Sequence, residues 1–314
     1  MSPQSTRTIV VVGGTGAQGQ GVIKALLSGL YGDAWRIRAL TRSPDSPKAQ
    51  SLLLNLQTSD GRLSLFPGHP YDATGLRHAF AGVYGVFAMT SEIYHGKTLV
   101  NEEDLKHEIQ AGKNMVLAAK ECGVKHFVFS SLPDVAEVSG GQFPGVHHMN
   151  NKAIIEEFAR KELNGFTSLM PVSRNIVVYK WTDPTDDMGA FAAKIFAVGV
   201  EKTNGKTFLA MSAQLSADDM AKTFTRVTGR PAVHSPISFE EFARVAAPLV
   251  GPAFKEDAKQ MMEWAAVMPW DRICYGSMDP EDDVSKEILE LKASSFETWL
   301  KRSGWTGPTK LYEE

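Results

Sequence analysis

Three regularly spaced glycines form the segment of this sequence with the clearest chemical meaning. Gly13, Gly16 and Gly19 follow directly on the apolar, β-branched run at residues 9–12. The first glycine permits a tight turn off a strand, and the second lets the backbone approach a pyrophosphate without a Cβ in the way. The third lets the next helix pack closely against the sheet, while the N–H groups and dipole at that helix start favour an anion. The segment therefore predicts a dinucleotide phosphate site.

The end of the second predicted strand indicates which dinucleotide binds. In a Rossmann fold, which binds dinucleotides, a protein that selects NAD usually has an Asp or Glu at this point. This acid accepts a hydrogen bond from the ribose 2′-OH. Here the strand ends Leu40-Thr41-Arg42-Ser43, without an acid. The Arg42 guanidinium is suited to a 2′-phosphate, and Lys48 is a candidate for a second positive charge. We therefore predict NADP(H) as the cofactor.

The elements that must position these residues alternate between strand and helix. Apolar runs predict strands at residues 9–12, 36–41, 63–66, 85–89 and 126–130. Apolar periodicity predicts helices at residues 22–30 and 102–122. This alternation is typical of an α/β fold with a doubly wound parallel sheet (a Rossmann fold), which binds ligands at the carboxyl ends of its strands.

The pattern changes after Asn150. Helices are predicted at residues 151–161, 188–200 and 217–228, and strands at 167–172 and 207–211. Ser216 with Asp219, and Ser238 with Glu241, have the spacing of helix N-caps. We expect a dinucleotide-binding domain at residues 1–172. A smaller, mostly helical substrate or partner domain is expected at 173–314, with some segments returning to the Rossmann core.

Composition narrows the class of protein. The 314 residues carry a formal net charge of −3, so no basic surplus points to direct nucleic-acid binding. The N-terminus lacks the apolar segment of a signal peptide, and no window resembles a membrane span. Cys122 and Cys274 form no CxxC motif and have no histidine at zinc-ligand spacing, so we expect no metal and a reducing, cytoplasmic or nuclear location.

Nearly the whole chain resembles the NmrA-like family of atypical short-chain dehydrogenases/reductases. The most specific part is the Gly-Gly-Thr-Gly-Ala-Gln-Gly loop at residues 13–19. Further resemblance lies in residues 38–42, 86–90, 123–131 and 228–243. The resemblance implies a Rossmann domain, a small C-terminal domain, a cleft between them and NADP(H).

The resemblance also implies roles for particular residues. The pyrophosphate would contact the loop residues after the first strand, namely Thr15, Gly16, Ala17 and Gln18. The 2′-phosphate would be held by Arg42 and Ser43, the adenine would lie near Asp72, and the ribose would lie near Thr90.

The catalytic residues of the resembled enzymes are only partly retained. A short-chain dehydrogenase uses Tyr-x-x-x-Lys, in which tyrosine donates the proton and lysine holds the nicotinamide ribose. Lys152 occupies the lysine position, but His148 stands where tyrosine is expected. Either His148 or Lys152 is able to transfer a proton, and Lys152 is expected to matter more because the family gives His148 no settled role. Ser131 occupies roughly the third catalytic position, for which Ser130 competes.

Two functions are compatible with these features. The first is an NADPH-dependent reductase of a small organic carbonyl or alkene. The second is a non-catalytic NADP(H) redox sensor that regulates a transcription factor or enzyme by protein contact. Lys152 favours the enzyme. The missing tyrosine favours the sensor, as does a connection of residues 176–186 that is shorter than in the resembled proteins. The sequence sets no oligomeric state.

Overall fold

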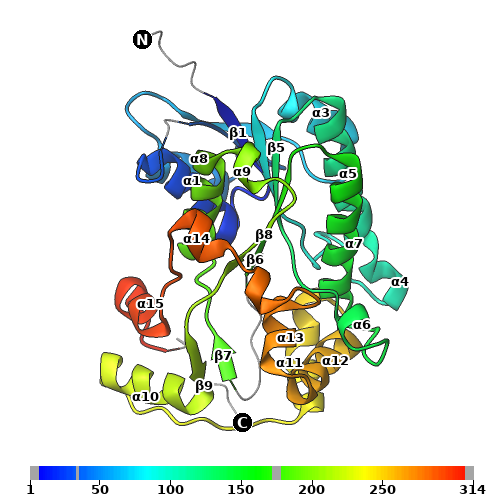
Figure 1. Cartoon of the computed structure of the whole chain (residues 1–314), viewed down its shortest axis with the longest axis vertical. Coiled ribbons are helices and arrows are strands. Elements are labelled where there is room, and N and C mark those ends of the chain that lie inside the picture. The colour runs from blue at the N-terminus through cyan, green and yellow to red at the C-terminus, as the bar shows by residue number, and fades with distance from the viewer. Residues whose placement is uncertain (1–6, 33–34, 172–177, 308–314) are drawn as a thin grey trace.

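The computed structural model describes residues 7–32, 35–171 and 178–307. Its elements form a twisted sheet with helices on both faces, and a group of helices lies beyond the carboxyl ends of the strands (Figure 1). Within the described ranges, no helix combines the length and apolar character needed to cross a membrane. In the same ranges, no cluster of His, Cys, Asp and Glu side chains is arranged to hold a metal ion.

The main sheet has seven strands, and all its neighbouring strands run parallel. In spatial order they are β3 (Leu63–Pro67), β2 (Arg36–Thr41), β1 (Thr8–Val11), β4 (Gly85–Ala88), β5 (His126–Ser130), β6 (Phe166–Pro171) and β8 (Thr207–Ala210). The strand order reverses between β1 and β4. In a doubly wound sheet, the crevice at this reversal is where ligands bind.

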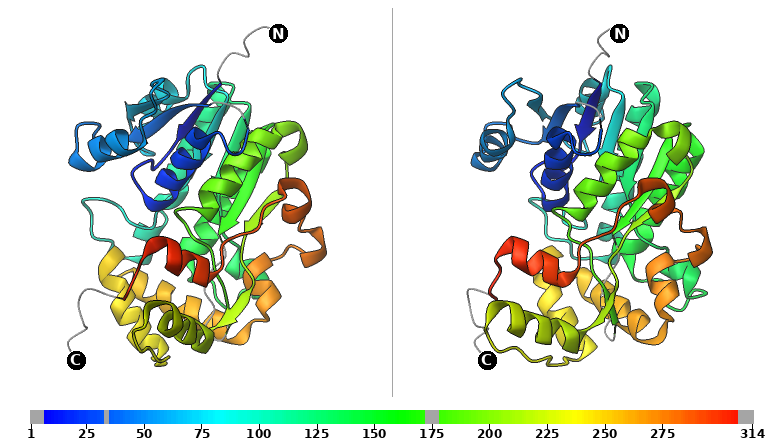
Figure 2. Two further views of the ribbon diagram at one scale, coloured as in Figure 1. Left: turned by 90° about the vertical axis from the view of Figure 1, so that its left-hand side faces the viewer. Right: turned by 60° about the vertical axis from the view of Figure 1, so that its left-hand side comes forward.

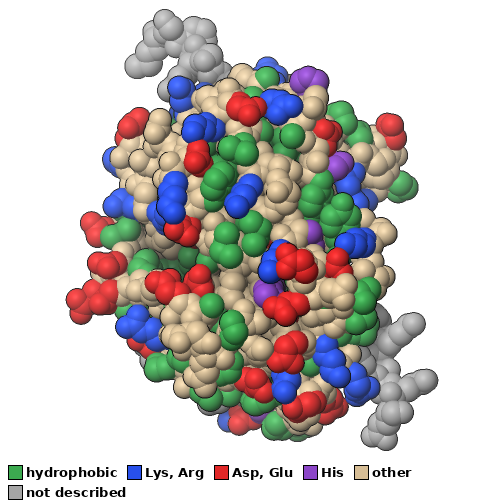
Figure 3. Space-filling view, turned by 90° about the vertical axis from the view of Figure 1, so that its right-hand side faces the viewer, with side chains coloured by type: hydrophobic (Ala, Val, Ile, Leu, Met, Phe, Trp, Pro, Cys, Tyr) green, Lys and Arg blue, Asp and Glu red, His purple; other side chains and the backbone are tan. Residues whose placement is uncertain are grey.

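Helices cover the two faces of the sheet in separate groups. One face is covered by α1 (Ala17–Ser28), α2 (Pro47–Leu56), α8 (Asp187–Val198), α9 (Val200–Thr203) and α14 (Ser285–Leu289). The other is covered by α3 (Ala73–Phe80), α5 (His107–Glu121) and α7 (His147–Glu162). On the molecular face in Figure 3, positive and negative side chains are interspersed.

Close backbone contact fixes α8 against α1. A Cβ on Gly189 would lie 2.3 Å from the Gly21 carbonyl oxygen, and one on Gly21 would lie 2.4 Å from that of Thr185. Phe191 and Phe196 of α8 then share one buried core with the side chains of α1. A segment that follows residue 172 in sequence thus packs in the half of the molecule that contains the glycine loop.

The remaining elements surround the carboxyl ends of the strands. They are α4 (Glu102–Leu105), α6 (Val135–Val138), α10 (Ala217–Thr228), α11 (Phe239–Val250), α12 (Phe254–Val267), α13 (Trp270–Tyr275), the 3₁₀ turn Pro280–Asp282 and α15 (Phe296–Ser303). A small antiparallel pair joins β7 (Val178–Lys180) to β9 (Gln214–Ser216). Figure 2 shows α15 beside α10, where Phe296 and Leu300 pack against Phe224.

The predicted fold class is confirmed, and most predicted elements are present. Helix α10 has the predicted bounds, and the reciprocal Ser216–Asp219 capping box is formed. Ser238 caps α11 by accepting from the Glu241 N–H.

Several predicted bounds were wrong. The helix expected at 102–122 is two helices, because the chain turns at Lys106 between α4 and α5. Helix α7 begins at His147 rather than Asn151. The strand expected to reach Val172 is described as far as Pro171, and the proposed domain division at 172 lies outside the described residues, as do residues 176 and 177 of the short connection. Residues 178–186 form β7 and the turn into α8.

Candidate functional site

The glycine loop joins β1 to α1 and is shaped by its own backbone. Gly13 has a φ of +70°, a conformation that favours glycine. Its carbonyl oxygen accepts a hydrogen bond from the Gly16 N–H at 2.9 Å. A Cβ on Gly19 would lie 2.2 Å from that same Gly13 carbonyl oxygen, so only glycine fits there. Gly19 thus lets α1 begin in close contact with Gly13 and Gly14, which follow the end of β1.

The start of α1 has the donors that an anion requires. Its N-cap is Gly16, which has no side chain to accept from the first-turn amides. Thr15, Ala17 and Gln18 lie at this helix start, where the Thr15 carbonyl accepts from Gln20. The Gln18 side-chain oxygen is buried and has no hydrogen-bond partner among the described residues. An unpaired buried polar atom beside open amides is suited to a polar ligand.

Positive groups gather at the carboxyl end of β2. Arg42, Ser43 and Lys48 are all exposed there. Burial, followed by the charges of Arg42 and Lys48, lowers the pKa of His95, so both cations lie within electrostatic reach of the loop after β4. The cations expected to hold a 2′-phosphate therefore both lie on the exposed surface that follows β2.

Asp72 follows β3 at the same edge of the sheet, but its carboxylate is already engaged. It is the N-cap of α3 and accepts the Gly75 N–H at 2.9 Å.

The neighbouring Tyr71 hydroxyl contacts His107 Nδ1 at 2.5 Å, and His107 Nε2 contacts the Glu92 carbonyl oxygen at 3.2 Å. The Glu92 carbonyl oxygen is able only to accept, so Nε2 of a neutral His107 ring carries the hydrogen and Nδ1 accepts from the Tyr71 hydroxyl. Burial raises the pKa of Tyr71, so this hydroxyl keeps its proton. This chain of contacts fixes the loop that follows β4.

Lys152 belongs to a buried ion pair that the sequence analysis did not identify. Its Nζ donates to Glu108 Oε1 at 2.5 Å and to the His148 carbonyl oxygen at 3.1 Å. Thr90 Oγ1 donates to the same Glu108 oxygen at 2.5 Å. Glu108 is fully buried and Lys152 is 8% exposed. The other carboxylate oxygen of Glu108 has no hydrogen-bond partner within the described part of the chain.

The packing of α5 against α7 places this pair. A Cβ on Gly112 would lie 2.4 Å from Ile155, so the two helices approach closely at this point. One turn earlier on each helix, Glu108 meets Lys152. Thr90 reaches them from the end of β4. Next to it, the Met89 sulfur lies 3.2 Å from a Cβ built on Gly13, so Met89 lies against the glycine loop while its neighbour Thr90 contacts the ion pair.

The two candidate serines at the end of β5 are both buried. Ser131 is 0% exposed, and its Oγ lies 3.5 Å from the Lys152 carbonyl oxygen, a long contact with the backbone of α7. Ser130 is 3% exposed. Both hydroxyls are therefore enclosed by the protein.

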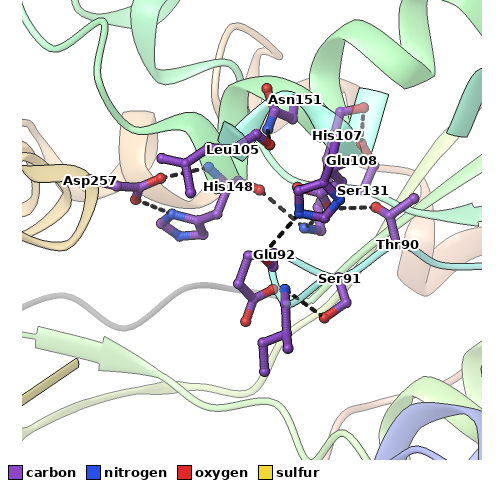
Figure 4. Close-up of polar contacts among 12 residues, drawn as sticks. Thr90, Ser91, Glu92, Leu105, His107, Glu108, Ser131, His148, Asn151 and Asp257 are labelled. Atoms are coloured by element: carbon purple, nitrogen blue, oxygen red, sulfur yellow. Dashed lines mark hydrogen bonds and ion pairs between the residues drawn. The ribbon is translucent and has the colours of Figure 1, made fainter. Parts of the chain in front are cut away.

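His148 is held by an acid from the C-terminal part of the chain. Asp257 of α12 accepts the His148 N–H through Oδ2 at 2.8 Å, and Oδ1 contacts the imidazole Nδ1. Phe254, one turn earlier on α12, packs against the ring edge-on at 5.5 Å between centroids. Figure 4 shows His148 beside Asp257, with Glu108 and Thr90 on the other side of the view.

Glu108 and Asp257 share a signal that is present in the sequence. Each is an acid on the buried face of a helix, since Glu108 is in phase with Ala111 and Met115, and Asp257 with Trp264. A buried acid needs a partner, and the two partners lie four residues apart on α7. The sequence did not indicate which basic group each acid meets, because both contacts join segments more than 40 residues apart.

Comparisons with known proteins show which family the chain resembles. Residues 5–169 match the model of the NmrA-like family. The NmrA-like family domain-containing oxidoreductase FrzB of Cladobotryum sp. is 28% identical over 282 residues, covering 76% of this chain and 79% of FrzB. The oxidoreductase hkm9 of Aspergillus hancockii is 27% identical over 354 aligned positions, covering 96% of this chain and 97% of hkm9.

A solved structure shows the same fold. It is that of NmrA, a negative transcriptional regulator, in complex with NADP. Its TM-score to this chain is 0.67 at 18% identity, with 94% of each chain covered. Since the family model spans more than half of the sequence, this chain belongs to the NmrA-like family.

Proposed function

We propose that the protein is an NADP(H)-dependent reductase of a small organic carbonyl or alkene. The observation that carries this proposal is the buried Lys152–Glu108 pair, joined by Thr90, whose neighbour Met89 lies against Gly13 of the glycine loop. Separating a lysine and a glutamate from water is costly, and a buried pair is not a strong source of stability. Its position at the ends of the central strands indicates use in chemistry.

The described residues fit NADP(H). The glycine loop has first-turn amides for the pyrophosphate, and the unpaired Gln18 oxygen awaits a donor. Arg42 supplies a fork of N–H donors for the 2′-phosphate, with Ser43 and Lys48 beside it. FrzB and hkm9 are named oxidoreductases, and the NmrA structure contains NADP, which supports the same cofactor here.

Lys152 acts on the bound cofactor as a positioning cation. Two of its three ammonium protons are donated to Glu108 and His148, which leaves one for a ribose hydroxyl. The unpaired oxygen of Glu108 is a matching acceptor for a hydroxyl proton. NADPH, when bound, supplies a hydride. The protein holds the acceptor next to the ends of β4 and β5 and provides the proton that completes the reduction.

The cofactor assignment is tested by binding. NADPH should bind more tightly than NADH, and Arg42→Ala should narrow the difference about tenfold or more, since a charge-assisted hydrogen bond contributes roughly 1.5–3 kcal/mol. Arg36→Ala is the matched control, because Arg36 is an exposed arginine at the opposite end of β2. Equal affinity of the wild-type protein for NADPH and NADH, measured by calorimetry, would contradict the assignment.

The catalytic assignment is tested by single-turnover oxidation of bound NADPH with ketones, aldehydes, enones and quinones. A reductase should oxidise NADPH faster with at least one compound than with buffer alone. Failure with all four classes, while NADPH still binds, would remove the support for catalysis.

A redox sensor is the second candidate function. Val245 and Leu249 lie one turn apart on α11, and their side chains are 50% and 74% exposed, as a surface for a protein partner would require. NmrA itself is described as a negative transcriptional regulator. This function predicts a partner whose affinity differs between the NADPH-bound and NADP⁺-bound protein, because only a differential affinity transmits a signal.

A further inference from the structure

We infer that His148 and Asp257 form a dyad in which Asp257 orients the imidazole and His148 Nε2 delivers the proton during reduction. This inference rests on the proposed reductase function and assigns its proton donor. It changes the relative importance for catalysis that the sequence predicts, in which Lys152 is the more important residue and His148 has no settled role.

The geometry of Asp257 determines which ring nitrogen carries hydrogen. Asp257 Oδ2 accepts the backbone N–H of His148, and Oδ1 contacts Nδ1. A carboxylate in this position accepts hydrogen bonds, so Nδ1 carries a hydrogen. Nε2 makes no hydrogen bond to any residue in the described ranges and is the nitrogen left to exchange a proton. The carboxylate also fixes the tautomer and the orientation of the ring, as an acid paired with a catalytic histidine does elsewhere.

The packing around Asp257 makes this orientation rigid. Asp257 is 1% exposed. Gln260, one turn later on α12, accepts the Gly145 N–H at 2.8 Å just before α7 begins. Trp264 of α12 packs in one cluster with Val146 and Met149 of the same region. Helix α12 is therefore fixed against the first turn of α7, where His148 lies.

Lys152 is poorly suited to the same task. Its ammonium group is the counter-charge of Glu108, whose carboxylate is fully buried. A proton lost from Lys152 would leave that carboxylate without a cation, which is costly in a buried site. Neutral His148 still offers its Nδ1–H and its backbone N–H to Asp257, and its side chain is 15% exposed, so water is able to restore a lost proton.

The proposed step balances. A carbonyl carbon that accepts a hydride pushes the C=O π electrons onto oxygen, giving an alkoxide. The Nε2–H bond of the imidazolium breaks, and its proton forms the O–H bond of the alcohol. The neutral His148 ring keeps the hydrogen on Nδ1, which stays hydrogen-bonded to the Asp257 carboxylate. NADPH is oxidised to NADP⁺, and solvent returns one proton to Nε2.

The first arm of the test examines the ligand-free protein. When the ring is neutral, ring ¹⁵N chemical shifts from long-range ¹H–¹⁵N correlation should show Nδ1 of His148 protonated and Nε2 unprotonated. In Asp257→Asn, the single amide oxygen should stay on the backbone N–H, which is able only to donate. The amide NH₂ then faces Nδ1, so the hydrogen should move to Nε2. A wild-type ring protonated on Nε2, or an unchanged ring in the variant, would overturn the dyad.

The second arm measures single-turnover reduction and NADPH affinity together. His148→Gln should slow the reduction about 10²-fold or more, the usual contribution of one acid–base group. Asp257→Asn should slow it about tenfold or more, and NADPH affinity should stay within about twofold in both variants. The control is His147→Gln, because neighbouring His147 pairs instead with the exposed Glu102 and should be dispensable.

The outcomes separate the two proposals. If the wild-type protein reduces a substrate and both variants match its rate, the dyad is refuted and the reductase stands. If NADPH binds but no compound is reduced by any form, the reductase function fails, and the proton-donor role of His148 fails with it. Circular dichroism and NADPH binding identify any variant that does not fold, and His148→Gln then decides without Asp257→Asn.

Discussion

Replacing Lys152 by methionine removes one partner of a buried ion pair and keeps most of the side-chain bulk. The remaining carboxylate of Glu108 is fully buried and keeps Thr90 as its donor. Breaking a buried pair in this way costs about 3–5 kcal/mol of unfolding free energy. The unfolding entropy of about 2.1 cal/mol/K per residue gives roughly 0.66 kcal/mol/K for this 314-residue chain. The melting temperature should therefore fall by about 5–8 °C.

A second substitution shows whether the loss comes from the unpaired charge. Glu108→Gln combined with Lys152→Met removes both charges, so the double variant should recover much of the loss and melt within about 3 °C of wild type. Lys161→Met is the matched control on the same helix, because Lys161 pairs with Glu157 where both side chains are 68% exposed. It should change the melting temperature by about 1 °C or less.

Scanning calorimetry of the four ligand-free proteins measures these differences. A Lys152→Met protein that melts at the wild-type temperature would refute the description of the pair as buried and coupled. A double variant as unstable as the single one would show that the loss arises from packing. In either case, NADPH oxidation by Lys152 variants has to be compared below the lower melting temperature, since otherwise unfolding would be counted as lost catalysis.

Three further outcomes are expected. Gly19→Ala should weaken NADPH binding about tenfold or more in a titration, because the alanine Cβ would meet the Gly13 carbonyl oxygen and displace the loop. An affinity equal to that of the wild-type protein would exclude this loop as the phosphate site. NADPH at 100 times its dissociation constant should add about 2.7 kcal/mol and raise the melting temperature by roughly 4 °C, whereas an unchanged temperature would argue against binding to the folded protein. Burial, and then the charge of Arg7, lowers the pKa of His126 to about 3. The unfolded chain therefore binds the extra proton below about pH 6.5, so stability should fall by roughly 1.5 kcal/mol from pH 6.5 to pH 5, and urea unfolding of His126→Gln should lack this part of the decline.

Local patterns explain why so much of the fold was predictable. The run at residues 9–12 is apolar at every position because both faces of β1 are covered by helices. The Ser216–Asp219 box closes within four residues, so its sequence alone specifies where α10 begins. The start of α7 was missed because its N-cap is Val146, and the capping acceptor is Asp257, from a helix 109 residues away.

The candidate site was predictable where it depends on the glycine loop and less so where it depends on tertiary contacts. Lys152 and His148 were identified because they occupy the Tyr-x-x-x-Lys positions of the resembled family. The hydrogen bonds and ion pairs of their side chains, however, depend on Glu108 and Asp257, which lie far from them in sequence. Ser131 illustrates the reverse difficulty. The family resemblance implies a catalytic serine at this position, whereas its complete burial is a property of the packed structure.

The contribution of late segments to the main sheet has a consequence for synthesis of the protein. The core beneath α1 includes Phe191, Phe208, Leu289 and Ala293, and β8 forms the last strand of the sheet. During translation, the apolar sides of β1 and α1 lack α8 until residue 198 has been made, and their core is not complete until residue 293 has been made. The core around the glycine loop is therefore completed only near the end of synthesis, and the growing chain exposes part of its apolar surface until then.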